Sequence, residues 1–572
     1  MKHYTRTIQG LTMKVFSAIF PSLFLTLKIT TTLIMLGVLA SCAQKDSPVS
    51  KEAAAEQARD AMLIPNSHYA DKIKITVLKS AGETASVGSD YRMVGVGDGI
   101  GVYSEDDKII ALMNHELKES QGGAFVSKWT LDKITHQVLN GEDLTKEVFF
   151  YKKSLPAKSG MSGYEMLNAA LSRLCSADLP AQTALLYTEN HVQFGTGEKI
   201  FFSGEETNTS YSEPENRQGR AFAHMITGEY AGKSYELPAM GRMSFENIVL
   251  NPYGQKKTIA MLMDDAKNQT YTTAWDELSD VEKELLKRNP PSELYVYIGE
   301  KQSSGDHPLE RAGLTNGQIY AVKVLDRQCA SDDAKCRNTP NAETREAWLD
   351  QPTAFELRSI EVPSNDEDGH GFQIATYKSG ATQFLRLEDG AWDSRSGHEN
   401  EYYFVTTDEF NGNSRLFKLT FNDIARPEQG GVISILINGN PEYGNREDSH
   451  QEDTNWEDKA LIMMDNITVD SWGRIVIQED PGSDPRLARI WLYDTVTGAI
   501  KETARHNPKY FDIDSGSADF LTSNEESSGI VQAFNTLGEG WYLLNVQAHA
   551  KYQDSAIVQH GQFLKMYVPR DL

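Results

Sequence analysis

Short apolar runs, separated by turn residues, dominate the chain from about residue 61 to the C-terminus. Residues 199–202, 294–298 and 402–405 are examples, and they are rich in β-branched and aromatic side chains. Clusters of Gly, Pro, Asn and Asp between such runs are typical of connected β-strands. Residues 469–477 contain a strand, a tight turn and a returning strand. The pattern therefore predicts a mainly β protein built from hairpins.

These hairpins favour a β-propeller, in which four-stranded sheets circle a central channel. No strict sequence period is visible, which excludes a consensus repeat array. We expect one propeller with six blades over residues 61–572, with helical and loop insertions between its strands. The expected insertions are a helix at 275–287, the region from Cys329 to Cys336, and an acidic loop at 438–457.

The N-terminus has the features of an export signal. Basic residues precede a long apolar region that ends in residues 39–42, Leu-Ala-Ser-Cys. This combination is typical of a secretory signal, and its last four residues resemble the bacterial lipobox, in which the cysteine is lipidated. We therefore expect residues 1–42 to be a lipoprotein signal peptide with lipidation at Cys42. Met13 is an alternative start.

Residues 43–60 are rich in Ala, Ser, Lys and Glu, and we interpret them as a flexible tether. The chain has no Asp directly after Cys42, which favours the outer membrane, with the protein facing the periplasm or the cell surface. The lipid anchor is then the expected membrane contact. An uncleaved membrane anchor is the alternative, and Lys28 within the apolar stretch argues against it.

Charge and cysteine content narrow the function classes. The chain has 56 Lys and Arg residues against 81 Asp and Glu residues, for a formal net charge of −25. This negative field argues against nucleic acid as a partner. Cys329 and Cys336 are close enough in sequence to form a disulfide in an exported protein. Cys175 ends a segment with helical apolar spacing, residues 164–175, and is interpreted as a buried structural thiol.

Acidic motifs follow or separate many of the apolar runs. Ionised carboxylates are costly to bury unless a cation compensates their charge, so repeated carboxylates at strand ends predict bound metal ions. Inner strands of a propeller can each supply one carboxylate to a shared axial site. Oxygen ligands favour calcium, whereas iron also accepts imidazole or thiolate. The motifs contain Glu116, Glu205, Glu206, Glu246, Glu388, Asp389, Asp465, Glu479, Asp480, Glu525 and Glu526.

Several of these segments resemble the PhoX-type bacterial alkaline phosphatases, in the order in which that family carries them. The segments are 197–207, 219–223, 237–247, 310–314, 384–392, 464–482 and 525–549. The resemblance runs from about residue 90 to the C-terminus. It implies a β-propeller with helical additions that hydrolyses phosphate esters with an iron–calcium cluster and without a seryl nucleophile.

The resemblance also implies roles for individual residues. Arg386 matches the arginine that steadies the phosphate, a task that suits a planar guanidinium. Glu205 and Asp389 are expected to face solvent beside ligand neighbours, as an alternative to binding metal themselves. The implied metal ligands are Glu116, Glu206, Glu246, Glu388, Asp465, Asn466 and Glu526.

One segment departs from the family. Better-known members carry a cysteine in an Asn-Cys segment shortly before the Glu-Glu motif, and that thiolate binds iron. Residues 188–194, interpreted as the equivalent stretch, contain no cysteine, so His191 is the expected replacement ligand. Cys175 is a poor substitute by its spacing. His549 is a second candidate, as a nitrogen ligand or as a general acid.

Three functions follow from these features. The first is a metal-dependent hydrolase of phosphate esters at the cell surface, with calcium and iron as cofactors. The second is a calcium-dependent propeller lactonase or ester hydrolase, which would need one axial calcium and no arginine that binds phosphate. The third is a non-catalytic surface lipoprotein that binds calcium. The pair Arg386 and Glu388 favours the first.

Overall fold

The structure is a computed structural model, and the residues it describes all belong to one compact unit, Arg59–Leu572. The expected signal peptide with Cys42, the helix at 275–287 and the pair Cys329 and Cys336 lie outside the described residues, as do nearly all of the tether and the acidic loop. The described residues are 60–151, 161, 163–167, 169–207, 219–265, 292–325, 352–361, 370–408, 414–438, 461–483 and 486–572.

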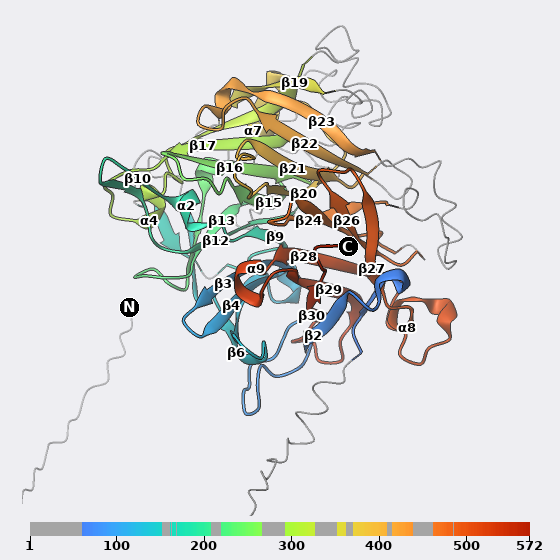
Figure 1. Cartoon of the computed structure of the whole chain (residues 1–572). Helices are drawn as coiled ribbons and strands as arrows, with labels where there is room; N and C mark the ends of the chain where they lie inside the picture. Colours follow the sequence, from blue (N-terminus) through green and yellow to red (C-terminus); the bar gives the residue numbers. More distant parts are fainter. Residues whose placement is uncertain are drawn as a thin grey trace, which may run out of the picture. The chain divides into compact units, whose positions relative to one another are not determined.

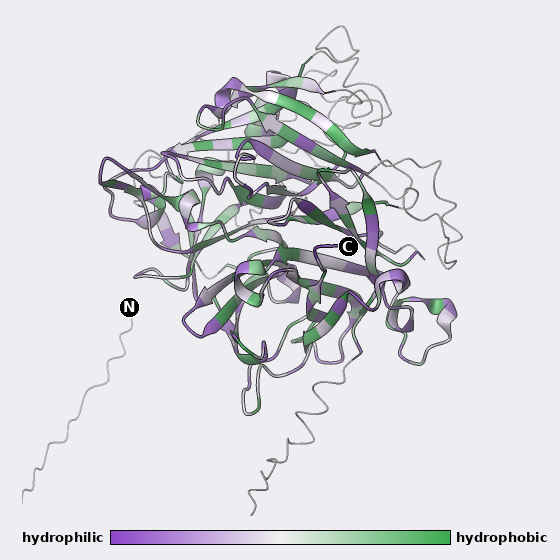
Figure 2. Ribbon diagram, viewed as in Figure 1, coloured by the Kyte–Doolittle hydropathy of each residue, from purple (hydrophilic) through white to green (hydrophobic). Residues whose placement is uncertain are grey.

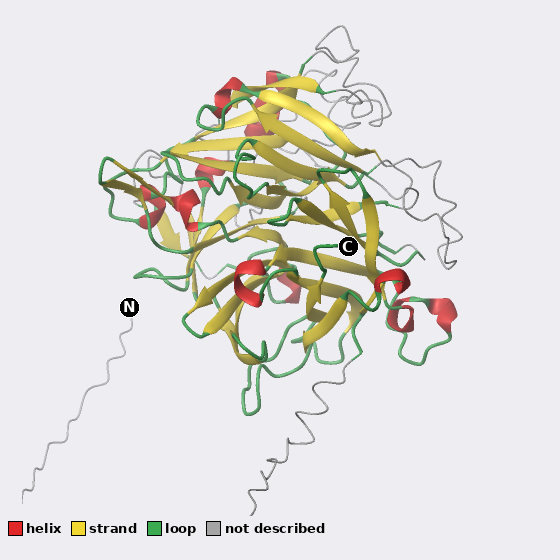
Figure 3. Ribbon diagram, in the orientation of Figure 1, coloured by secondary structure: helices red, strands yellow, loops and turns green. Residues whose placement is uncertain are grey.

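Strands make up most of the described structure, and its helices are short and lie between or outside the sheets (Figure 3). The α-helices are α2 (Gln182–Leu185), α4 (Pro308–Arg311), α7 (His370–Ser379), α8 (Pro508–Phe511) and α9 (Phe534–Leu537). Single 3-10 turns are η1 (Ser67–Tyr69), η2 (Glu119–Gln121), η3 (Pro238–Met240), η6 (Pro427–Gln429) and η10 (Ile513–Ser515). None of the described helices is long and apolar enough to cross a membrane.

The strands follow one another in groups of about four, mostly antiparallel (Figure 1). The first sheet contains β3 (Gly97–Glu105), β4 (Lys108–His115), β5 (Phe125–Asp132) and β6 (Val138–Asp143). The next contains β7 (Glu147–Tyr151), β8 (Tyr164–Met166), β9 (Leu174–Asp178), β12 (Ile200–Glu205), β13 (Ala221–Met225) and β14 (Lys233–Glu236). A separate hairpin is formed by β10 (Leu186–Glu189) and β11 (Val192–Gly195).

A nine-stranded sheet joins two further groups. Its first part is β15 (Phe245–Leu250), β16 (Lys257–Asp264), β17 (Leu294–Glu300), β18 (Gln318–Val324) and β19 (Thr353–Ile360). Its second part is β20 (Leu387–Trp392), β21 (Glu401–Thr406), β22 (Arg415–Phe421) and β23 (Gly431–Asn438). Because β19 pairs with β23, the sheets do not define the blades one by one.

Two sheets complete the fold and contain strands from both ends of the described chain. One is β1 (Leu63–Pro65), β24 (Met464–Val469), β25 (Arg474–Glu479), β26 (Arg489–Asp494) and β27 (Ile500–His506). The other is β2 (Lys74–Ser80), β28 (Glu525–Gln532), β29 (Trp541–Lys551) and β30 (Gln559–Tyr567). In Figure 1 the blue strand β2 lies beside the red strand β30, with which it pairs. The N-terminal part of the domain therefore closes its C-terminal sheet.

An edge strand from each of the six groups contributes to an inner ring. These inner strands are β3, β9, β15, β20, β24 and β28; each contacts the next in this order, and β28 contacts β3. Apolar side chains fill the space between neighbouring sheets, as where Leu112 and Phe201 pack together. Figure 2 shows the apolar residues concentrated on the strands and the polar ones on most loops. Burial of both sheet faces is the main stabilising contribution.

The mainly β, propeller-like fold predicted from the sequence is confirmed, whereas the count of six blades stays a prediction. The hairpin at residues 469–477 is also present: Asp470 Oδ1 accepts hydrogen bonds from the backbone N–H groups of Trp472 and Arg474. The helix predicted at 164–175 is wrong. Its two ends pair instead as β8 with β7 and as β9 with β12, so tertiary pairing overrides the local helical spacing.

Candidate active site

A cavity of about 470 Å³ opens where the inner strands begin. Eight carboxylates face it, together with one thiol, two arginines and one histidine. The charged and thiol side chains that line it are Asp98, Glu116, Lys118, Arg173, Cys175, Glu206, Glu246, Arg386, Glu388, Asp465, Asp480, Glu526 and His549.

The pocket has an internal order that the sequence hides. The second residue of every inner strand lines the pocket, and each belongs to a different strand of the ring. These residues are Asp98, Cys175, Glu246, Glu388, Asp465 and Glu526. In β3, β15, β20 and β24 the pairing register shifts between the first and fourth residues, as between Phe245 and Ile248. Such bulges re-aim side chains, so the shifted strands turn their carboxylates toward the shared pocket.

A second set of residues surrounds the first. In each of the six groups, the backbone carbonyl of the residue before the inner strand accepts a hydrogen bond. The donor is the backbone N–H of a residue at or near the end of the strand that pairs with the inner strand, as Glu116 donates to Val96. We call the donors of these six bonds the outer set. The outer set is Glu116, Glu206, Asp265, Thr407, Asp480 and His549. Five of these six side chains line the pocket, and Asp265 contacts Arg386, which does.

The third residues of the inner strands form a polar layer behind the pocket. Asn247 Nδ2 donates to Asp389 Oδ1 at 2.6 Å, and Asn466 Nδ2 lies 2.6 Å from Ser176 Oγ. Ser176 Oγ in turn donates to Glu246 Oε1 at 2.6 Å. A further cavity of about 320 Å³ is lined by Ser176, Asn247 and Asp389 on their other side. The layer thus separates the pocket from the remainder of the channel and fixes Glu246.

Potential ligand atoms cluster in four overlapping triads. Within each triad they lie within 4.8 Å of one another, and neighbouring triads share Cys175, Glu246 or Asp465. The triads are Asp98–Glu116–Cys175, Cys175–Glu206–Glu246, Glu246–Glu388–Asp465 and Asp465–Asp480–Glu526. An uninterrupted chain of donor sets of this kind suits several cations bound side by side.

The pKa values of these carboxyl groups indicate that the cluster has too few cations to balance its negative charge. Burial and the neighbouring carboxylates raise the pKa of Asp98, Glu246 and Asp465 well above the usual range. Burial also raises the pKa of Glu206 to about 7. Asp98 Oδ1 is buried and accepts no hydrogen bond from the described residues. Carboxylates packed this closely need bound cations to remain ionised.

Arg386 precedes Glu388 in the pocket wall. Its Nε and Nη2 donate to the two oxygens of Asp265 at 2.9 and 2.6 Å, and Nη2 lies 2.8 Å from Glu388 Oε1. Burial lowers the pKa of the guanidinium, but Asp265 and Glu388 outweigh burial and raise it. Its φ of +58° is uncommon for a residue with a side chain, and such strain persists where the surroundings fix it.

His549 belongs to the outer set and lies beside Glu526. Its Nε2 is 3.4 Å from Glu526 Oε2, and its Nδ1 is 2.9 Å from Gln559 Oε1. Burial lowers the pKa of the imidazole, but Glu526 outweighs burial and raises it to about 9. The ring can therefore carry a proton at the edge of the pocket.

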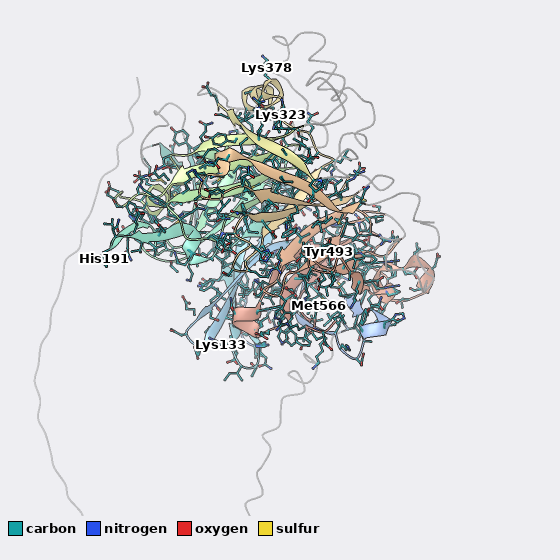
Figure 4. All side chains as sticks on the ribbon, turned by 45° about the horizontal axis from the view of Figure 1, so that its top comes forward. Lys133, His191, Lys323, Lys378, Tyr493 and Met566 are labelled. Carbon is teal, nitrogen blue, oxygen red and sulfur yellow. The ribbon has the colours of Figure 1, made fainter. Side chains whose placement is uncertain are left out.

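The structure brings together most of the predicted site, but it moves two residues. His191 is exposed at the turn of the β10–β11 hairpin, and Figure 4 shows it at the outer end of that hairpin. Cys175, interpreted from the sequence as structural, instead lies in the pocket with its Sγ 3.0 Å from Glu206 Oε2. The pocket therefore contains a thiol, and His191 lies outside it. The physical reason is the strand pairing of β9, which carries Cys175 to the ring.

Three smaller corrections concern residues next to the ligands. Glu205 does not face solvent: it is fully buried and accepts hydrogen bonds from Arg220 Nε at 2.8 Å and from the backbone of Ser172. Asp389 is buried in the polar layer. Asn466 also lies in that layer, where its Oδ1 accepts from the backbone N–H of Gly529 at 2.7 Å, and it does not line the pocket.

Five residues of the site received no ligand or phosphate-binding role from the sequence, namely Asp98, Arg173, Cys175, Asp265 and Asp480, although Asp480 stands in one of the acidic motifs. A usable signal existed for two of them. Asp265 and Asp480 each directly follow an apolar strand, as Glu116 and Glu206 do. Asp98 stands between two glycines, and a helical interpretation hid Arg173 and Cys175.

Fold and pocket together define a mainly β, propeller-like protein whose central pocket combines clustered carboxylates, a thiol and guanidinium groups. The family model for alkaline phosphatase PhoX matches residues 287–540, which include Arg386, Glu388, Asp465 and Glu526. This match confirms the resemblance to the PhoX family and identifies the chain as a phosphoric ester hydrolase. A search of curated proteins gave no match.

The chain is similar to solved structures at low sequence identity. PhoX from Pseudomonas fluorescens in complex with vanadate, a transition state analogue, has 11% identity and a TM-score of 0.58, covering 87% of this chain and 95% of that chain. The α-L-arabinofuranosidase Arb93A from Fusarium graminearum has 9% identity and a TM-score of 0.37, covering 89% and 98%. An oligogalacturonate lyase in complex with manganese has 10% identity and a TM-score of 0.29, covering 84% and 99%.

Proposed function

We propose that this chain is a metal-dependent phosphatase of the cell envelope, in which several cations are held along the chain of triads. The observation that carries the proposal is the convergence of one ligand-type side chain from the second position of all six inner strands. Such convergence buries several negative charges side by side, which lowers the stability of the folded protein unless bound cations compensate them.

The donor atoms present fit the expected metals. Carboxylate oxygens suit calcium, and the triad of Cys175, Glu206 and Glu246 adds a thiolate that suits iron. Burial and the adjacent carboxylates raise the pKa of the Cys175 thiol well above its usual range, so a bound cation would be needed to keep it as a thiolate. The unpartnered Asp98 Oδ1 is a further oxygen available to a cation.

Different residues of the chain would then have different roles in the hydrolysis of a phosphate ester. Bound cations would supply Lewis acidity and would neutralise the phosphoryl oxygens. Arg386, held in place by Asp265, presents the remaining edge of its guanidinium to those oxygens while charge develops on them. His549, whose Nε2 faces Glu526 in the pocket, is placed to donate a proton to the leaving oxygen.

The proposed location is the outer membrane, reached through the signal peptide at residues 1–42 and a lipid on Cys42. The support is the sequence pattern of the N-terminus described above. Membrane contact would be through the lipid alone, so that the pocket meets phosphate esters in the periplasm or outside the cell.

The test uses protein that lacks residues 1–42. Its metal content is measured by elemental analysis, and its hydrolysis of p-nitrophenyl phosphate and bis(p-nitrophenyl) phosphate is measured with calcium and iron supplied. We expect more than one bound metal per chain and hydrolysis that strong chelators abolish. Full activity after chelation would contradict the cluster. Metal binding without hydrolysis of either ester would favour the non-catalytic alternative, and hydrolysis of lactones in its place would favour the lactonase.

A further inference from the structure

Arg173 occupies the same place in its strand group as Arg386 does in its own. Each arginine directly precedes an inner strand and stands two residues before a pocket ligand, Cys175 or Glu388. Both have left-handed backbone, with φ of +47° for Arg173 and +58° for Arg386, as do Val96 and Met463 at the same position of two other groups. The other four groups have Val96, Ser244, Met463 and Asn524 at this position. Only these two groups therefore place a cation there.

The contacts of the two arginines also correspond. Arg386 Nε donates to Asp265, the outer-set residue of the group before it, and Arg173 Nε donates at 2.7 Å to Glu116, the outer-set residue of the group before it. Each then uses Nη2 for a carboxylate of its own group, Glu388 or Glu206. Nη1 of neither arginine donates a hydrogen bond within the described part of the chain.

The two arginines flank one shared ligand. Arg173 pairs with Glu206 of the triad Cys175–Glu206–Glu246, and Arg386 pairs with Glu388 of the triad Glu246–Glu388–Asp465. Both triads include Glu246. The inner strand β15, which carries Glu246, contacts both β9 and β20 and so lies between the two arginines in the ring. Arg173 remains one-third exposed at the pocket wall. A group bound over Glu246 is therefore approached by guanidinium groups from two sides.

We propose that Arg173 is a second phosphoryl-binding residue, acting together with Arg386 on the same phosphoryl group; the inference rests on the proposed function. A phosphoryl group has more non-bridging oxygens than one forked guanidinium engages, so a second guanidinium adds charge-assisted hydrogen bonds in a different plane. Arg173 thereby selects phosphate and phosphate esters over esters that present a single acyl oxygen.

The test compares Arg173→Gln and Arg173→Lys with the wild type and with Arg92→Gln. Arg92 is a matched control, because it is paired with Asp554 at 2.6 Å on the surface, outside the pocket. Binding of inorganic phosphate to metal-loaded protein is measured by calorimetry, and KM and kcat are measured with p-nitrophenyl phosphate. Elemental analysis and melting temperature establish that the cluster and the fold persist.

We expect Arg173→Gln to weaken phosphate binding and to raise KM by roughly 10- to 100-fold, the range for hydrogen bonds to charged groups, with metal content unchanged. We expect Arg173→Lys to fall between it and the wild type, because lysine keeps the charge but loses the fork. Unchanged phosphate affinity in Arg173→Gln would overturn the inference.

Two further outcomes are decisive. If Arg173→Gln loses metal, the phosphate affinity of Arg173→Lys becomes the test. An affinity equal to that of the wild type would overturn the inference, because a purely structural ion pair needs only the positive charge. If the wild type hydrolyses phosphate esters but the Arg173 variants behave like Arg92→Gln, this inference fails while the proposed function stands. If the wild type neither binds phosphate nor hydrolyses its esters, both fail.

Discussion

Removing the Arg386 guanidinium should destabilise the protein as well as impair phosphate binding. Asp265 is 1% exposed, and both its oxygens accept hydrogen bonds from Arg386. Arg386→Met keeps much of the apolar stem but leaves the Asp265 carboxylate buried without its cation. Breaking a buried ion pair in this way costs about 3–5 kcal/mol. Metals in the pocket would not offset this cost, because Asp265 does not line the cavity.

The measurement is urea unfolding of Arg386→Met, Asp265→Asn and the double variant, with metals supplied and tryptophan fluorescence as the signal. We expect Arg386→Met to lower the free energy of unfolding by about 3–5 kcal/mol, and Asp265→Asn to recover at least half of that loss in the double variant. Arg92→Met, which breaks a surface pair, serves as the control and should leave stability unchanged.

Loss of less than about 1 kcal/mol in Arg386→Met, without recovery in the double variant, would refute the assignment of Asp265 as the residue that holds the arginine. The kinetic prediction is separable from the thermodynamic one. The double variant should remain inactive toward p-nitrophenyl phosphate although it folds, because the group that contacts the phosphoryl oxygens is absent from it.

Three other outcomes are expected. Cys175→Ser should lower iron content and kcat by about tenfold or more, since substituting even a residue that only supports a metal ligand has an effect of that size. Unchanged iron content by elemental analysis would exclude the thiol as a ligand. His191→Ala should leave metal content unchanged and stability within about 0.5 kcal/mol, because the residue is exposed on a hairpin tip, and a loss of metal would restore its predicted role. Burial raises the pKa of Asp178 to about 7, so its stabilising proton is present at acidic pH and is lost as the pH rises through 7. Asp178→Asn should therefore lose less stability between pH 5 and 8 than the wild type. The measurement is the melting temperature as a function of pH, and the same pH dependence in both proteins would contradict this.

The sequence supports the fold class well because strands leave a local signal. Alternating apolar and turn residues predict hairpins such as residues 469–477, and an acidic residue at the start or end of an apolar run predicts Glu246, Glu388 and Asp465 as neighbours in the pocket. Position along the strand is the feature that all six share, since the second residue is Asp in two inner strands, Glu in three and Cys in one.

The sequence misled where tertiary pairing decides the outcome. Residues 164–175 have helical spacing, yet β9 is an inner strand that pairs with β12, so Cys175 reaches the pocket whereas His191 lies outside it. Asp98 is a second residue whose place in the pocket depends on tertiary pairing. Its neighbours are glycines rather than large apolar residues, and only the closure of β28 against β3 brings it beside Glu526 and Glu116.

Closure of the ring explains why a site of this charge can exist at all. Six inner strands that meet at one opening bring their second side chains together whatever those side chains are, and carboxylates at five of the six positions oppose that approach by mutual repulsion. The buried apolar contacts between sheets and the pairing of β2 with β30 hold the ring shut against this repulsion. Two arginines neutralise part of the charge, through Glu116 and Glu206 in one case and through Asp265 and Glu388 in the other. Among the described residues, the carboxylates of Asp98, Glu246 and Asp465 have no arginine partner. Burial and neighbouring carboxylates raise the pKa of each well above its usual range, so the remaining charge is concentrated where cations would bind.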